Sequence, residues 1–212
     1  MKRFIVMILL LMSVGCQAKT DYKETLVTDT KALANSPITY LCSNYKKLYR
    51  YYLDPSLHLR ESGETYSVVD YDDDLIVINV NIDQIINDSN YHIFRRDYGK
   101  DLLTIEAYDK YVDNQGNKQD YTLLAYQEDD LVYLVLRDNK LIISSLVAES
   151  DVLVVANKMM NILKSASVDT EKVMEAYAGL VTSEYTKKPT DLFKSLLPSN
   201  TTLDDIIKQN QD

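Results

Sequence analysis

The sequence predicts an α+β domain: an N-terminal amphipathic helix, an antiparallel β-meander of about six to eight strands, and C-terminal helices packed on one sheet face. Three observations lead to this fold class. Apolar residues recur at three- and four-residue steps over residues 37–52, strand-like alternation fills residues 57–147, and helical spacing returns after Glu149. This order is typical of folds in which helices lie apart from an antiparallel sheet.

The first predicted helix begins at Ser36-Pro37, a good N-cap followed by a proline that needs no helical hydrogen bond. It ends before Pro55, because the residue preceding a proline is driven out of helical geometry. Its apolar stripe is about 120° wide, as a core-facing helix requires. The stripe comprises Ile38, Leu41, Cys42, Tyr45, Leu48, Tyr49 and Tyr52, and the opposite face carries Lys46, Lys47 and Arg50.

Strands follow in a series of β-rich segments joined by turn residues. The predicted strands are 66–70, 75–82, 91–95, 102–111, 121–127, 131–136 and 140–147. Short connections such as Asp138-Asn139 join antiparallel neighbours, since parallel strands need long crossovers. Segment 131–136 is apolar on both faces, which indicates a central strand, whereas Asn79 and Asn81 predict a wet face for segment 75–82.

Two helices are predicted after the strands, the first capped by Ser150 and the second by Asp169. Short amphipathic pieces follow at 191–197 and 203–208. Residues 17–36 are polar with both charge signs and predict a flexible tether, with at most a weak helix over Lys23–Ala34.

The first sixteen residues have the layout of an export signal. Lys2 and Arg3 precede an apolar run over 4–12, and Ser13-Val14-Gly15 lead to Cys16. The run is shorter than the roughly 20 apolar residues that span a bilayer. A cut after Ala18, which leaves a soluble secreted protein, is the alternative.

This segment resembles the signals of bacterial envelope lipoproteins, although Ser13 stands where that family prefers Leu. The resemblance implies cleavage before Cys16, acylation of that cysteine, and an extracytoplasmic lipid anchor. Gln17 rather than Asp after the cysteine implies outer-membrane placement in a two-membrane organism. The expected organisation is a signal at 1–15, an anchor cysteine and flexible tether at 16–36, and a single α+β domain at 37–212.

Charge limits the partners. The whole chain has a formal charge of −9, and removal of the signal leaves 21 basic against 32 acidic residues, or −11. Such a charge disfavours nucleic acid, whose phosphates need basic patches. It favours a protein partner, one of basic character included, although charge also serves solubility alone.

Three groups of residues are candidate contact sites. Partner binding is expected of the acidic run Asp70, Asp72, Asp73 and Asp74 and of the strand tyrosines Tyr108, Tyr126 and Tyr133, and membrane contact of Lys46, Lys47 and Arg50. Each has a plainer interpretation: a solvated turn, the preference of tyrosine for strands, and a solvated helix face. Calcium is not expected at the acidic run, because Leu75 and Asn81 stand where a calcium loop needs Gly and Glu.

No catalytic motif, cofactor or metal site is expected. Neither His58 nor His92 has a second histidine or cysteine at ligand spacing, and no Gly-x-Ser-x-Gly motif occurs. The sequence therefore predicts a lipid-anchored extracytoplasmic binding protein without catalytic activity, of inhibitor or immunity type. A structural or assembly lipoprotein is the alternative, and a hydrolase is less favoured.

Overall fold

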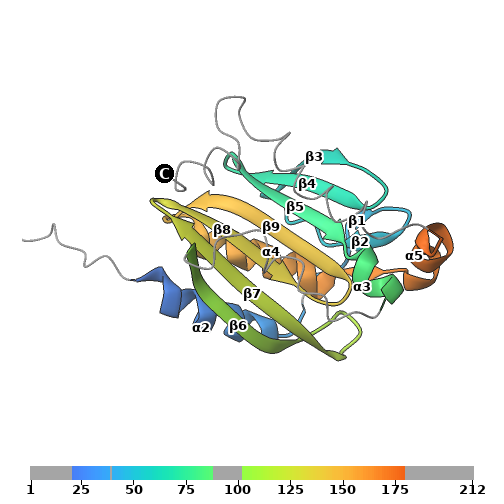
Figure 1. The fold of residues 1–212 in the computed structure, drawn as a ribbon, viewed down its shortest axis with the longest axis horizontal. Coiled ribbons are helices and arrows are strands. Elements are labelled where there is room, and N and C mark those ends of the chain that lie inside the picture. The colour runs from blue at the N-terminus through green and yellow to red at the C-terminus, as the bar shows by residue number, and fades with distance from the viewer. Residues whose placement is uncertain (1–20, 39, 88–101, 180–212) are drawn as a thin grey trace, which may run out of the picture.

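The computed structural model describes residues 21–38, 40–87 and 102–179. Their largest element is a seven-stranded antiparallel sheet with the order β3-β4-β5-β9-β8-β7-β6 (Figure 1). Its strands are β3 (His58–Ser62), β4 (Tyr66–Tyr71), β5 (Asp74–Val80), β6 (Leu103–Val112), β7 (Lys118–Glu128), β8 (Leu131–Arg137) and β9 (Leu141–Ala148). The order is two meanders joined by the β5–β9 pair, because the chain leaves β5 and resumes at the opposite edge with β6.

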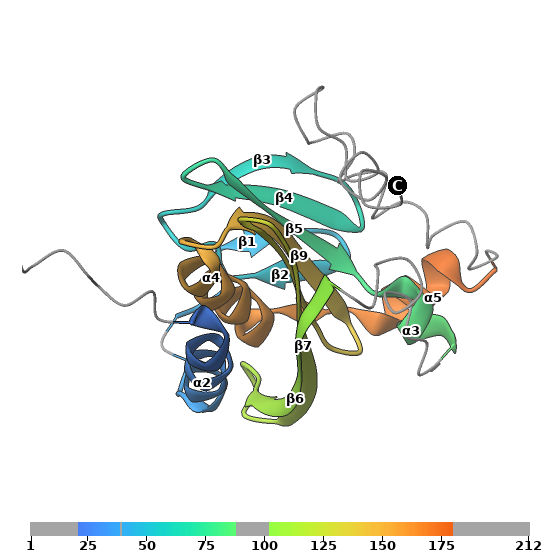
Figure 2. The ribbon, with the colours of Figure 1, turned by 60° about the vertical axis from the view of Figure 1, so that its left-hand side comes forward.

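A second layer covers one face of this sheet. It contains helix α2 (Tyr22–Asn35), helix α4 (Val152–Ser165) and a small antiparallel sheet of order β1-β2-β10, as Figure 2 shows. The small strands are β1 (Asn44–Tyr45), β2 (Tyr49–Tyr51) and β10 (Ser167–Val168). Two short helices, α3 (Ile82–Asn87) and α5 (Thr170–Tyr177), lie together at one end of the molecule. The α+β class with antiparallel sheets is therefore confirmed.

Most of the strand predictions, which depend on local signals, are confirmed. Segments 66–70, 102–111, 121–127, 131–136 and 140–147 each match an observed strand to within a few residues at either end. Strand β8 is central and buried on both faces, as its apolar sequence predicted. Asp169 caps α5 by accepting a hydrogen bond from Lys172 N, while Asp151 rather than Ser150 occupies the N-cap of α4. The predicted strand 91–95 and the pieces 191–197 and 203–208 lie outside the described residues.

Both faces of the large sheet are apolar. The face toward α2 and α4 contributes Val69, Ile76, Ile78, Leu123, Leu134 and Ile143 to the main core. The opposite face carries a second buried cluster formed by Val68, Val77, Leu124, Tyr126, Tyr133, Val135 and Ile142. The wet face predicted for β5 is therefore wrong, since Val77 and Asn79 are both buried there.

The helix predicted over residues 37–52 is also wrong. Within this stretch the chain forms strands β1 and β2 and no helix among its described residues, and the stripe residues Leu41 and Tyr45 are exposed. Within β2 the pattern has a period of two, because Tyr49 and Tyr51 are buried and Arg50 is exposed. Pairing with β10, more than 100 residues later in the chain, and burial of these two tyrosines override the helical spacing.

The weak helix expected over Lys23–Ala34 is a full helix, and over this length the chain is not the flexible tether that was predicted. Residues 22–35 form α2, which packs against α4 and β6. Tyr22, Leu26, Thr30 and Ala34 recur every four residues and make its buried stripe. Thr30 and Ala34 add little hydrophobicity, which is why composition alone suggests a polar linker.

A buried lysine holds the end of α2. Lys164 of α4 is fully buried, and its ammonium group donates to Leu33 O, Ser36 O and Ser36 Oγ at 2.5, 2.6 and 3.0 Å. Burial lowers the pKa of Lys164, and the carbonyls at the negative end of α2 stabilise its charge. Lys31 of α2 also pairs with Asp109 of β6 at 2.8 Å, so α2 is fixed to the body.

Candidate protein-binding surface

The β1–β2 hairpin is held by its inner face. Tyr49 and Tyr51 of β2 are buried with stacked rings, and the Tyr49 hydroxyl hydrogen-bonds Ser67 Oγ of the large sheet at 2.6 Å. Burial raises the pKa of Tyr51 and that of Tyr49, so both hydroxyls stay neutral. On its other side β2 pairs with β10. The hairpin is thus a rigid part of the domain.

Its outer face exposes apolar side chains. Leu41, just before β1, is 88% exposed and Tyr45 is 66% exposed, the two largest values among the large hydrophobic residues described. Tyr45 donates its hydroxyl hydrogen to Cys42 O at 3.0 Å, which directs the ring back toward the residues that precede β1. Arg50 lies directly opposite Tyr45 in the strand pair. This set of Leu41, Tyr45 and Arg50 is termed the hairpin patch below.

The three predicted membrane-facing cations are close in space but differ in their contacts. Lys46 donates to Ser62 Oγ at 2.8 Å, and Lys47 forms an ion pair with Glu64 at 2.6 Å. The Lys47 ammonium lowers the pKa of Glu64. Lys46 and Lys47 therefore tie the hairpin to the β3–β4 turn, whereas the Arg50 side chain has neither a hydrogen bond nor an ion pair among the described residues.

The four acidic residues do not form one site. Asp72 and Asp73 have positive φ values of 46° and 77° and make the exposed turn between β4 and β5, as the plainer interpretation predicted. Burial, with the carboxylates of Asp151, Asp72 and Asp73, raises the pKa of Asp74 to about 6. Asp70 instead lies beside Arg60, with 3.3 Å between Asp70 Oδ2 and Arg60 Nε.

The predicted tyrosine surface is not formed by all three of its members. Tyr126 and Tyr133 form a cross-strand pair with ring centroids 6.3 Å apart, and they are only 6% and 7% exposed in the second cluster. Tyr108 is 55% exposed on edge strand β6 and donates a hydrogen bond to Glu106. The sequence shows that these strands carry tyrosine, but not that both sheet faces are buried.

Other candidate chemistry has structural explanations. Asp113 accepts hydrogen bonds from Gln115 N and Asn117 N and closes the β6–β7 turn. No group of three or more His, Cys, Asp or Glu within residues 21–38, 40–87 and 102–179 is placed to hold a metal ion. In the same residues no helix has the length and apolarity needed to cross a membrane. Cys16 and His92 lie outside the part of the chain that the structure describes.

Comparison with protein-family models, with curated proteins and with solved structures gives no match to this chain. The candidate surface therefore stands on its own geometry. The residues that the sequence missed are Leu41 and Tyr45, which the helical spacing assigned to a buried stripe. The alternation at Tyr49, Arg50 and Tyr51 was the signal for a strand, but three residues are too few to outweigh a longer helical pattern.

Proposed function

We propose that this chain is a lipid-anchored extracytoplasmic protein of the bacterial envelope that binds another protein and has no catalytic role. The signal-like segment ending at Cys16 supports the anchor. The hairpin patch is the observation that carries the binding role. Leu41 and Tyr45 project from a rigid hairpin, beside an arginine without a partner among the described residues.

The chemistry of the hairpin patch indicates what it binds. Tyrosine and arginine are the residues that most often dominate protein interfaces, since they combine contact area with polar tips. Burying Leu41 would add about 1.5–3 kcal/mol of hydrophobic stabilisation. Arg50 needs a carboxylate once it is removed from water. The expected partner is thus a protein segment that presents an apolar side chain next to an acidic one, and inhibition or immunity would be forms of such binding.

The hairpin is already ordered for this role. Tyr49 and Tyr51 fix its inner face, and the contacts of Lys46 and Lys47 fix its turn. Binding to an ordered surface avoids the entropic cost of immobilising a loop. Affinity should fall as salt rises, because Arg50 is exposed to solvent.

Site-specific photocrosslinking in cells of the source organism tests this proposal. A benzoylphenylalanine residue replaces Tyr45 in one variant and Tyr108 in another, since both are exposed tyrosines on different parts of the domain. We expect one defined protein adduct from position 45 and its loss when Arg50→Glu is added. Adducts that are the same from both positions, or that survive Arg50→Glu, would rule out the hairpin patch.

A further inference from the structure

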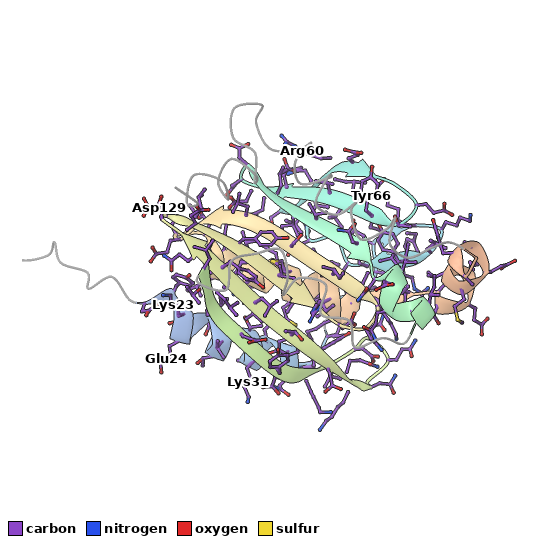
Figure 3. All side chains as sticks on the ribbon, viewed as in Figure 1. Lys23, Glu24, Lys31, Arg60, Tyr66 and Asp129 are labelled. Atoms are coloured by element: carbon purple, nitrogen blue, oxygen red, sulfur yellow. The ribbon has the colours of Figure 1, made fainter. Side chains whose placement is uncertain are left out.

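Several turns of the large sheet meet at one end of the molecule. The β5–β9 and β8–β9 registers bring the β4–β5 turn, the β7–β8 turn and the β9–α4 connection together, and Glu149 N donates to Asp130 O at 3.0 Å. This end, termed the acidic end, carries Asp21, Asp72, Asp73, Asp74, Asp129, Asp130, Glu149 and Asp151. Figure 3 shows Asp129 there with Lys23 and Glu24 at the start of α2.

Helix α2 begins at the acidic end. Tyr22, its first residue, donates a hydrogen bond to Gln127 next to the β7–β8 turn, at 3.2 Å. Its 14 residues then run about 21 Å along the body, away from that end. The hairpin patch follows the far end of α2, where Lys164 holds Leu33 and Ser36. The start of α2 and the hairpin patch thus lie toward opposite ends of the domain (Figure 1).

The distance from an anchored cysteine to the body is short. Because α2 is fixed to the domain, only residues 17–20 separate Cys16 from Asp21. These five residue steps span at most about 17 Å even when fully extended. A coil of 20 residues, in contrast, would have an end-to-end distance of about 25 Å and would let the body turn freely.

We infer that the anchored protein stands with its acidic end toward the lipid headgroups and holds the hairpin patch on the side away from the bilayer. This inference rests on the proposed lipid anchor. It separates the two roles: one end meets the membrane and the other meets the partner. It also removes Lys46 and Lys47 from membrane contact, because they lie at the membrane-distal end.

The facing surfaces repel each other when the lipids are anionic. The acidic end carries eight acidic residues, and burial together with repulsion from Asp151, Asp72 and Asp73 raises the pKa of Asp74 there. Repulsion from anionic headgroups acts over a Debye length of about 8 Å at 0.15 M salt and about 30 Å at 0.01 M. The body should therefore be held off an anionic bilayer at low salt and approach it as salt rises, within the reach of the tether.

Energy transfer from dyes at the two ends of β7 tests the orientation. Full-length lipidated protein carrying Cys42→Ser is labelled at Asp130→Cys or at Gln115→Cys and placed in vesicles with a headgroup-labelled acceptor lipid. The 11 residues of β7 separate these sites by about 35 Å. We expect transfer from position 130 to exceed that from position 115 by about twofold or more over this separation.

Two further sets of measurements test whether charge repulsion and the short tether determine this orientation. With phosphatidylglycerol vesicles, transfer from position 130 should rise between 0.01 and 0.15 M salt, and with phosphatidylcholine it should not change. The variant Asp72→Asn/Asp73→Asn/Asp129→Asn should lose most of this salt dependence. Asparagine suits all three positions, because each has a positive φ. Insertion of 12 Gly/Ser residues between Thr20 and Asp21 should abolish the difference between the two dyes.

Mass spectrometry of the same sample distinguishes failure of the proposed anchor from failure of the proposed orientation. A mature N-terminus at Lys19, or an unmodified Cys16, would refute the proposed anchor and with it the orientation. A confirmed lipid on Cys16 together with equal transfer from both dyes, or stronger transfer from position 115, would refute the orientation alone. Greater transfer from position 130 that the inserted linker removes supports it.

Discussion

The substitution Asp74→Asn should stabilise the protein at alkaline pH. Asp74 is the first residue of β5, and burial together with Asp151, Asp72 and Asp73 raises its pKa from an ordinary value of 3.8 to about 6. No hydrogen bond or ion pair of its carboxylate occurs among the described residues, so asparagine removes a repelled charge and no attractive contact. The change is also nearly isosteric.

The magnitude and sign follow from linkage. Before solvent screening is considered, the rise in the pKa of Asp74 from 3.8 to about 6 corresponds to about 3 kcal/mol of destabilisation of the charged form. The residue is half-buried, and solvent screening reduces this to about 1–2 kcal/mol. Because the folded state holds the Asp74 proton more tightly than the unfolded state, the contribution of Asp74 to stability is fully present below about pH 4 and is lost as pH rises through about 6. Asparagine does not titrate, so the variant escapes this loss.

Urea unfolding at pH 3.5 and pH 8 measures the effect on protein made without residues 1–15 and with Cys16→Ser. We expect Asp74→Asn to exceed wild type by about 1–2 kcal/mol at pH 8 and to match it near pH 3.5. The midpoint temperature at pH 8 should rise by about 3–6 °C for a domain of this size.

Asp120→Asn is the matched control for this experiment. Asp120 is a highly exposed residue paired with Lys110, and its replacement removes the same charge with an expected effect within about 0.5 kcal/mol. Equal stabilisation by Asp74→Asn at both pH values, or a loss of stability at pH 8, would refute the electrostatic argument.

Other substitutions test the interior. Lys164→Met should cost about 2–3 kcal/mol in guanidinium unfolding, because it removes three charge-assisted hydrogen bonds to the end of α2. Tyr111→Phe should lower thermal stability by about 1–2 kcal/mol, since the Tyr111 hydroxyl donates to Asp138 Oδ2 at 2.6 Å. Tyr133→Ala should cost about 3–5 kcal/mol by calorimetry. Tyr108→Ala should change stability by less than about 0.5 kcal/mol, and equal costs for these two tyrosines would contradict the burial of the second cluster.

Six of the seven strands of the large sheet were predictable because their signals are local, whereas β3 (His58–Ser62) was not predicted. Alternation fixes which side chains share a face, and turn residues fix where each strand ends. The Asp72-Asp73 pair shows this directly, since two residues with positive φ give the tight turn that joins β4 to β5. The strand order was not predictable, because the pairing of β5 with β9 depends on contacts between residues about 70 positions apart.

The structure of the N-terminal region was predicted poorly for two physical reasons. Helix α2 buries a narrow stripe that includes the small residues Thr30 and Ala34, so its hydrophobic signal is weak. Residues 37–52 have strong helical spacing, yet β2 gains more by pairing with both β1 and β10 and by burying Tyr49 and Tyr51. Tertiary contacts decide both cases, and the exposure of Leu41 and Tyr45 depends on the second.

The placement of α2 also determines which of two candidate surfaces, the acidic turn or the hairpin patch, a partner could reach. A free 20-residue tether would leave the acidic turn at Asp72-Asp73 and the hairpin patch equally open, and charge alone would then favour a basic partner at the turn. With α2 fixed to the body, the proposed lipid on Cys16 would draw the acidic end to within about 17 Å of the bilayer. A globular partner would have to enter that gap to reach the acidic turn, whereas the hairpin patch stays accessible from the far side. Salt weakens binding at either end, so the sign of the partner's charge distinguishes them: binding through Arg50 requires an acidic contact region and should fail with Arg50→Glu, while binding at the acidic turn would be unaffected by that change.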